Sequence, residues 1–126
     1  IREPTYVQHM PKPKILSSSY TNVIDAIALM KTNLEEPLSV KDIAHHIGLS
    51  SRQLQRIFNK NFSCSPQQYY VRLRLEHAKY ILKHTTLPIS QIVLASGFID
   101  NSAFSSAFKK NYGMTPSHYR QENQLI

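Results

Sequence analysis

The sequence is short of the residues that mark a β-sheet, a disulfide-linked fold or a membrane span. Tryptophan is absent, there are 3 glycines in 126 residues, and runs of β-branched residues are short, which favours an all-helical fold. The single cysteine, Cys64, cannot form a disulfide within the chain, and a reducing, cytoplasmic setting fits. No stretch is long and apolar enough to span a membrane, and no signal peptide is visible.

Catalytic and metal-binding patterns are missing as well. The sequence shows no Ser-His-Asp spacing, no glycine-rich phosphate loop and no pair of carboxylates placed for acid–base chemistry. His45 and His46 are adjacent and point about 100° apart on a helix, while His77 and His84 lack a cysteine or acid to complete a zinc site. We therefore predict no enzyme activity, no metal and no cofactor.

Negative charge is scarce, and it is absent from the stretch 43–75. The net charge is +7, and between Ile43 and Leu75 there are five Lys or Arg residues and no acid. From His84 to the end there are three Lys or Arg residues and two acids. A basic excess suits a polyanion such as nucleic acid or an anionic membrane surface. The binding surface is expected on the first half of the folded domain.

The stretch 51–62 has an apolar side and a basic side. Four residues recur at helical spacing and form a stripe suited to a core: Leu54, Ile57, Phe58 and Phe62. The opposite side is polar or basic, without an acid: Ser51, Arg52, Gln55, Arg56 and Asn59. Arg and Gln are long donors of the kind that contact base edges in a DNA major groove. A solvated surface helix is the alternative interpretation of this stretch alone.

A helix-turn-helix unit is predicted around this stretch. Apolar periodicity predicts a first helix over 20–33, and Ser39 followed by Asp42 marks the capped start of a short second helix. Gly48 can adopt the positive φ that closes a tight turn, and Ser50 caps the helix that follows. Helix, glycine turn and helix form the helix-turn-helix unit.

The same unit returns later in the chain. Ser65-Pro66 starts a long helix predicted over 66–83. Beyond it the pattern recurs at an offset of 49 residues before the turn and 50 after it, at Ile89, Ile92, Val93, Gly97, Phe104, Phe108, Tyr112, Thr115-Pro116 and Tyr119. The repeat predicts two units joined by a rigid helix. Their second helices would enter successive major grooves, about 34–36 Å apart.

The domain organisation follows from the repeat. Residues 1–19, with their prolines and serines, are interpreted as an interdomain linker or tail. Residues 20–126 are interpreted as the DNA-binding domain, divided into a first unit (20–64), a connecting helix (65–86) and a second unit (87–126). Because the chain opens with Ile1 rather than Met, we expect a further domain on its N-terminal side.

Residues 23–120 resemble the DNA-binding domain of the AraC/XylS transcription regulators. The strongest similarity is Gly-Phe-Ile-Asp-Asn-Ser-Ala-Phe-Ser-Ser-Ala-Phe-Lys-Lys at 97–110, followed by Gly-Met-Thr-Pro-Ser-His-Tyr-Arg at 113–120. The resemblance implies an all-α, seven-helix domain of two helix-turn-helix subdomains joined by a long central helix. It further implies binding to double-stranded promoter DNA, contact with RNA polymerase and, in most members, activation under the control of an N-terminal sensor domain. Segments 35–39, 52–54 and 64–70 are most similar to the subfamily whose sensor resembles a class I glutamine amidotransferase.

The resemblance places the DNA-contacting positions on two helices. In the first they fall on Arg52, Gln55 and Arg56, beside Ser51, and in the second on Asn101, Ser102, Ser105 and Ser106. Ser106 stands where the family often has arginine, so the second helix is expected to contribute less to sequence recognition. Lys60, Lys109 and Lys110 are interpreted as phosphate contacts or solubilising charges. For Arg72 and Arg74 on the long helix, an ion pair with an acid such as Glu76 or Asp42 is the alternative to a DNA contact.

Two other functions remain open from the sequence. A basic helical adaptor could bind another protein or anionic lipid. A repair protein could methylate itself at Cys64, which lies in the loop before Ser65, although a lone loop thiol is usually inert.

Overall fold

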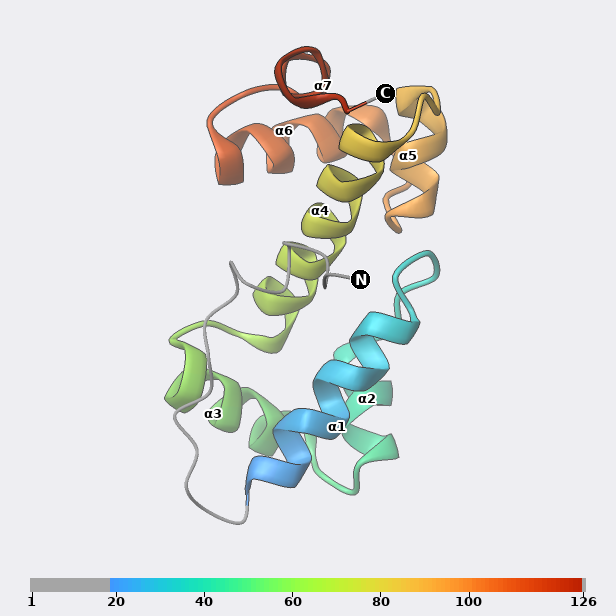
Figure 1. Ribbon diagram of the computed structural model, residues 1–126. Helices are drawn as coiled ribbons and strands as arrows, with labels where there is room; N and C mark the ends of the chain where they lie inside the picture. The colour runs from blue at the N-terminus through green and yellow to red at the C-terminus, as the bar shows by residue number, and fades with distance from the viewer. Residues whose placement is uncertain (1–18, 126) are drawn as a thin grey trace.

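The computed structural model describes residues 19–125, which form seven α-helices and contain no strand (Figure 1). The helices are α1 (Ser19–Thr32), α2 (Val40–His46), α3 (Ser51–Phe62), α4 (Pro66–His84), α5 (Ile89–Ala95), α6 (Asn101–Tyr112) and α7 (Pro116–Asn123). The predicted all-α fold of two helix-turn-helix units joined by a long helix is confirmed. The predicted linker, 1–19, lies outside the described residues apart from Ser19, which begins α1.

Side-chain caps set the starts of α3 and α4. The Ser50 hydroxyl accepts from the Gln53 backbone N–H at 3.1 Å, and the Gln53 side chain accepts from the Ser50 N–H at 2.9 Å. Ser65 and Gln68 make the same reciprocal pair. These capping boxes satisfy backbone donors that the first turn of a helix leaves without partners.

Left-handed backbone residues close the turns. Gly48 (φ 78°) lies between α2 and α3 and Gly97 (φ 81°) between α5 and α6, as the sequence predicts. After α6 the turn residue is Gly113 (φ 77°), whereas after α3 the equivalent position is Ser63 (φ 56°). A serine at positive φ is less favourable than a glycine, so the first unit carries backbone strain that the second lacks.

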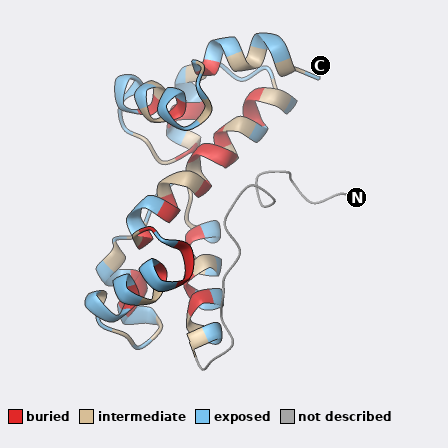
Figure 2. Cartoon of the chain, turned by 90° about the vertical axis from the view of Figure 1, so that its left-hand side faces the viewer, coloured by how far each residue is buried: buried red, intermediate tan, exposed pale blue. Residues whose placement is uncertain are grey.

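Two hydrophobic cores lie on the two halves of α4. We call α1–α3 the first unit and α5–α7 the second unit; Figure 1 shows them around the N-terminal and C-terminal halves of α4. The first core contains Leu54, Phe58 and Leu73, and the second contains Leu75 and Phe104. Figure 2 shows buried residues along the length of this shared helix. Because α4 contributes to both cores, the two units are held on one rigid element.

Buried polar groups on α4 have partners that the sequence did not suggest. Tyr112 donates to the buried carboxylate of Glu76 at 2.5 Å, and Lys79 pairs with the same carboxylate at 3.5 Å. The ion pair considered for Arg72 or Arg74 with Glu76 or Asp42 is not formed. Arg74 instead donates to the backbone carbonyl of Gly97, and Arg72 lies beside the sulfur atom of Cys64. Burial and the hydrogen bond to Glu76 raise the pKa of Tyr112 far above its usual value. Tyr112 therefore stays a protonated donor that bridges α6 and α4.

The helices formed by residues 19–125 include none with the length and apolar content that a bilayer crossing requires.

Candidate nucleic-acid interface

The exposed side of α3 carries the first set of predicted DNA contacts. Arg52, Gln55 and Arg56 are exposed, and Ser51 is half-buried in the first turn. We call these four residues the α3 face. Leu54 and Phe58 are completely buried on the other side of the helix, which fixes its rotation. The long side chains of the α3 face therefore extend into solvent, with Lys60 exposed one turn beyond Arg56.

The positive charges of the α3 face have no anionic partner within the described part of the chain. The ion pairs there are Lys79–Glu76 and His118–Glu122, and neither involves Arg52 or Arg56. Two unpaired guanidinium groups on one side of a helix can each donate to a phosphate or make a two-donor contact to a guanine edge. The surface is thus suited to an anionic, hydrogen-bonding ligand.

The second set of predicted contacts lies on α6 and differs in chemistry. Asn101, Ser102 and Ser106 are exposed, and Ser105 is half-buried. We call these four residues the α6 face. Lys109 is exposed close to it. The α6 face has only short hydroxyl and amide side chains, so its contacts reach less far than those of Arg52 or Arg56.

Asp100 adds to this difference and was not among the predicted site residues. Its carboxylate caps α6 by accepting from the Ser102 N–H at 2.7 Å and the Ala103 N–H at 3.4 Å. The equivalent cap of α3 is the neutral Ser50. A carboxylate at the start of α6 occupies the free N–H groups and repels phosphate. The preference for Asp at the N-cap position was the available sequence signal.

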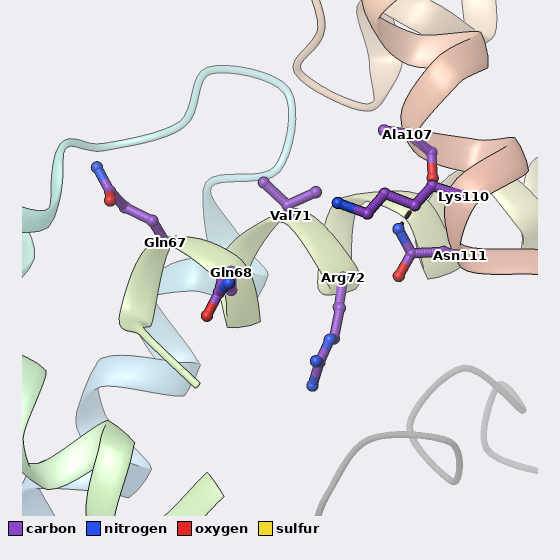
Figure 3. Close-up of a pocket in the computed structure, with 7 residues that line it drawn as sticks. All are labelled: Gln67, Gln68, Val71, Arg72, Ala107, Lys110 and Asn111. Atoms are coloured by element: carbon purple, nitrogen blue, oxygen red, sulfur yellow. Dashed lines mark hydrogen bonds between the residues drawn. The ribbon is translucent and has the colours of Figure 1, made fainter. Parts of the chain in front are cut away.

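A hollow separates α6 from the N-terminal half of α4 (Figure 3). Its volume is about 340 Å³, and it is lined by Gln67, Gln68, Val71, Arg72, Ala107, Lys110 and Asn111. In Figure 3 the Lys110 side chain extends across it toward Val71, whereas the Arg72 guanidinium points away from Lys110. None of the described residues that line the hollow is an acid. Its charge therefore has the same sign as that of the α3 face.

Comparison with known proteins establishes the family. Residues 43–122 match the sequence profile of a family described as a helix-turn-helix domain. A solved transcriptional regulator from Chromobacterium violaceum, described as having an AraC-type DNA-binding domain, superimposes with a TM-score of 0.81 at 39% identity, over 85% of this chain and 96% of that chain. The chain belongs to the AraC-type helix-turn-helix family. It has the DNA-binding fold of transcription regulators of this family.

One similar regulator extends well beyond the compared region. The transcriptional regulator ArgR of Pseudomonas aeruginosa is 40% identical over 124 residues, which is 98% of this chain and 38% of that protein. The chain thus spans well under half the length of that regulator. The DNA-binding domain of AdpA, solved in complex with a target DNA, has the same fold, with a TM-score of 0.75 at 22% identity over 80% of this chain and 91% of that chain.

Cys64 is packed inside the AraC-type fold rather than displayed in a reactive loop. It is 4% exposed and belongs to the first core. Burial raises the pKa of its thiol, although the Arg72 guanidinium opposes this, so the nucleophilic thiolate is disfavoured. Self-methylation would require access to this atom, and the packing does not provide it.

Proposed function

We propose that this AraC-type domain binds double-stranded promoter DNA in a sequence-specific manner, with α3 and α6 in successive major grooves. We propose further that α3 makes most of the base contacts and α6 mainly fixes position. The contrast between the two faces supports this assignment: α3 presents Arg52, Gln55 and Arg56, whereas α6 presents short side chains behind the acidic Asp100. A single chain with two recognition helices can occupy a site that simpler helix-turn-helix proteins cover as dimers.

The proposal includes the role of the whole regulator. We propose that it is a cytoplasmic activator that contacts RNA polymerase. We further propose that its N-terminal sensor domain resembles a class I glutamine amidotransferase. In this proposal the DNA-binding domain has no catalytic residue and needs no metal or cofactor. The resemblance to the AraC/XylS regulators and the sequence similarity to the regulator ArgR support this assignment.

Selection of bound sites from random duplex DNA is the direct test. A selected site should then be titrated over a salt series with nonspecific competitor present. Specific binding predicts an enriched sequence and a steep decrease of affinity with salt. Recovery of no enriched sequence, together with equally tight binding to anionic lipid vesicles, would favour the adaptor hypothesis.

Replacing Arg56 by alanine should weaken binding to the selected site by about 1–3 kcal/mol and relax preference at one base pair. Arg56 is exposed, has no ion-pair partner among residues 19–125 and can donate two hydrogen bonds to guanine O6 and N7. The matched variant Ser106→Ala on α6 should weaken binding to the selected site by less than Arg56→Ala does. A loss from Ser106→Ala equal to that from Arg56→Ala would contradict the unequal roles of the two helices.

Replacing Lys110 by alanine should reduce the slope of log affinity against log salt by about 1, without changing the preferred sequence. Ser102, Ser106 and Lys110 are spaced four residues apart, so Lys110 lies one turn beyond the α6 face, where the groove edge and its phosphates would be. Lys31, exposed at the end of α1, provides a charge-matched control. An unchanged slope for Lys110→Ala would make Lys110 a solubilising charge only.

A further inference from the structure

The turn of the second unit packs directly on the loop between α1 and α2 of the first unit. A Cβ atom added at Gly97 would overlap the Leu34 carbonyl oxygen and lie 2.8 Å from Pro37 Cγ. At Gly48, the equivalent turn of the first unit, an added Cβ would meet no atom of the described residues within 4 Å. Both glycines have nearly the same φ, so the close approach is particular to Gly97. Gly97 thus permits a backbone-to-backbone contact between the two units.

Arg74 of α4 lies in the same contact. Its Nη1 donates to the Gly97 carbonyl at 2.7 Å, and its guanidinium carbon lies 4.6 Å from the centre of the Phe98 ring. Burial lowers the pKa of Arg74, and its buried Nε has no hydrogen-bond partner within the described part of the chain. A partly desolvated guanidinium that leaves one donor unused is a weak source of stability. Its geometry suits a different role, which is to hold the 97–98 turn at a fixed place along α4.

The first unit's loop is tied to α4 one turn earlier. Tyr70 donates to the Asn33 carbonyl and accepts from the Leu38 N–H at 3.0 Å. The Arg74 guanidinium also lies 5.7 Å from the Tyr70 ring centre. Residues 33–38, α4 and residues 97–98 therefore form one connected set, which we call the inter-unit contact. Outside it, α4 is the helix that packs extensively against both units, and within the described part of the chain no extensive helix–helix packing joins α1–α3 directly to α5–α7.

We propose that the inter-unit contact fixes the distance and rotation between α3 and α6, and so determines the half-site spacing that the domain accepts on DNA. This inference rests on the proposed function. Adding one base pair between half-sites moves the second groove by about 3.4 Å and rotates it by roughly 34–36°. A protein whose two units are locked together cannot follow that change, whereas one whose units are free to hinge can. Gly97 and Arg74 are thus positioning residues that select spacing without touching a base.

The test compares Gly97→Ala with Gly48→Ala on a set of duplexes. Each duplex carries the two selected half-sites with their separation changed by zero, one or two base pairs, and a further duplex carries the α3 half-site alone. The wild-type domain should prefer one spacing by on the order of tenfold over its neighbours. Gly97→Ala should keep its affinity for the single half-site while its spacing preference falls to about twofold or moves to another spacing. Gly48→Ala introduces the same backbone strain without the collision and should keep the wild-type preference.

Arg74→Met provides a second variant, which weakens the inter-unit contact without placing an added atom against the Leu34 carbonyl. It keeps the aliphatic stem of residue 74 and removes the guanidinium, which donates to Gly97 and lies over Phe98. Arg74→Met should also reduce the spacing preference, by less than Gly97→Ala does. An unchanged preference in both folded variants would overturn the inference, as would a wild-type domain that binds all spacings equally. Absence of any selected sequence for the wild-type domain would instead overturn the proposed function.

Discussion

Replacing Phe104 by alanine is expected to lower the free energy of unfolding by about 3–5 kcal/mol. The Phe104 side chain is completely buried, and its ring centre lies 5.3 Å from that of Phe98 and 5.9 Å from that of Phe108. Removal leaves a cavity among aromatic side chains that cannot move freely to fill it. For a domain with a total stability of about 5–15 kcal/mol, this loss is large. Urea unfolding followed by circular dichroism measures it.

The effect of Phe104→Ala should also be local. Amide hydrogen exchange should lose protection across α5–α7 and the C-terminal half of α4, because these segments share the second core. Leu54→Ala is the matched variant, since Leu54 occupies the equivalent completely buried position in the first core. It should reduce protection mainly in α1–α3. Equal losses in both units for both variants would show that the two cores unfold as one.

Replacing Arg120 by methionine is expected to lower the free energy of unfolding by about 2–3 kcal/mol. Arg120 of α7 donates to the carbonyl of Leu87 at 2.6 Å, to that of Leu82 at 3.2 Å and to that of Thr85 at 3.3 Å. These carbonyls lie at and just beyond the end of α4, where helix carbonyls lack partners within the helix. The guanidinium therefore satisfies several acceptors at once and places positive charge at the negative end of the α4 dipole.

The control for Arg120→Met is Gln124→Leu. Gln124 donates one neutral hydrogen bond to the Thr85 carbonyl at 2.7 Å. Its replacement should cost about 1 kcal/mol, because a single neutral hydrogen bond is lost. A loss from Arg120→Met no larger than that from Gln124→Leu would mean that the three bonds of Arg120 are no stronger in water than one neutral bond. Methionine retains the apolar stem, so lost packing does not account for the expected difference.

The sequence alone predicts the parts of this fold that depend on neighbours three or four residues away. Ser50 with Gln53 specifies a capping box, Gly48 and Gly97 specify left-handed turns, and the spacing of Leu54 and Phe58 specifies which side of α3 is buried. Each of these signals involves residues within about one turn of helix, so it can be recognised without knowledge of the tertiary structure. The exposure of Arg52, Gln55 and Arg56 followed from the same periodicity; their contact with DNA stays a prediction.

Partners distant in the chain were not predictable. Arg74 and Arg120 bond to carbonyls more than twenty residues away, and Tyr112 reaches Glu76 from the second unit. Charge pairing suggested acids as partners for the arginines of α4, yet a guanidinium finds backbone acceptors equally well when helix ends present them. Which of these partners forms depends on how α4 is packed by both units, and no local pattern encodes that arrangement.

The shared α4 also limits how this domain can change over evolutionary time. Leu73 and Leu75 belong to different cores although they are two residues apart on one helix. Inserting a single residue between them would turn the whole second unit by about 100° and shift it by about 1.5 Å. Substitutions on the α3 and α6 faces carry no such penalty. We expect homologues with different operators to diverge freely at those exposed positions while insertions and deletions within α4 are eliminated by selection.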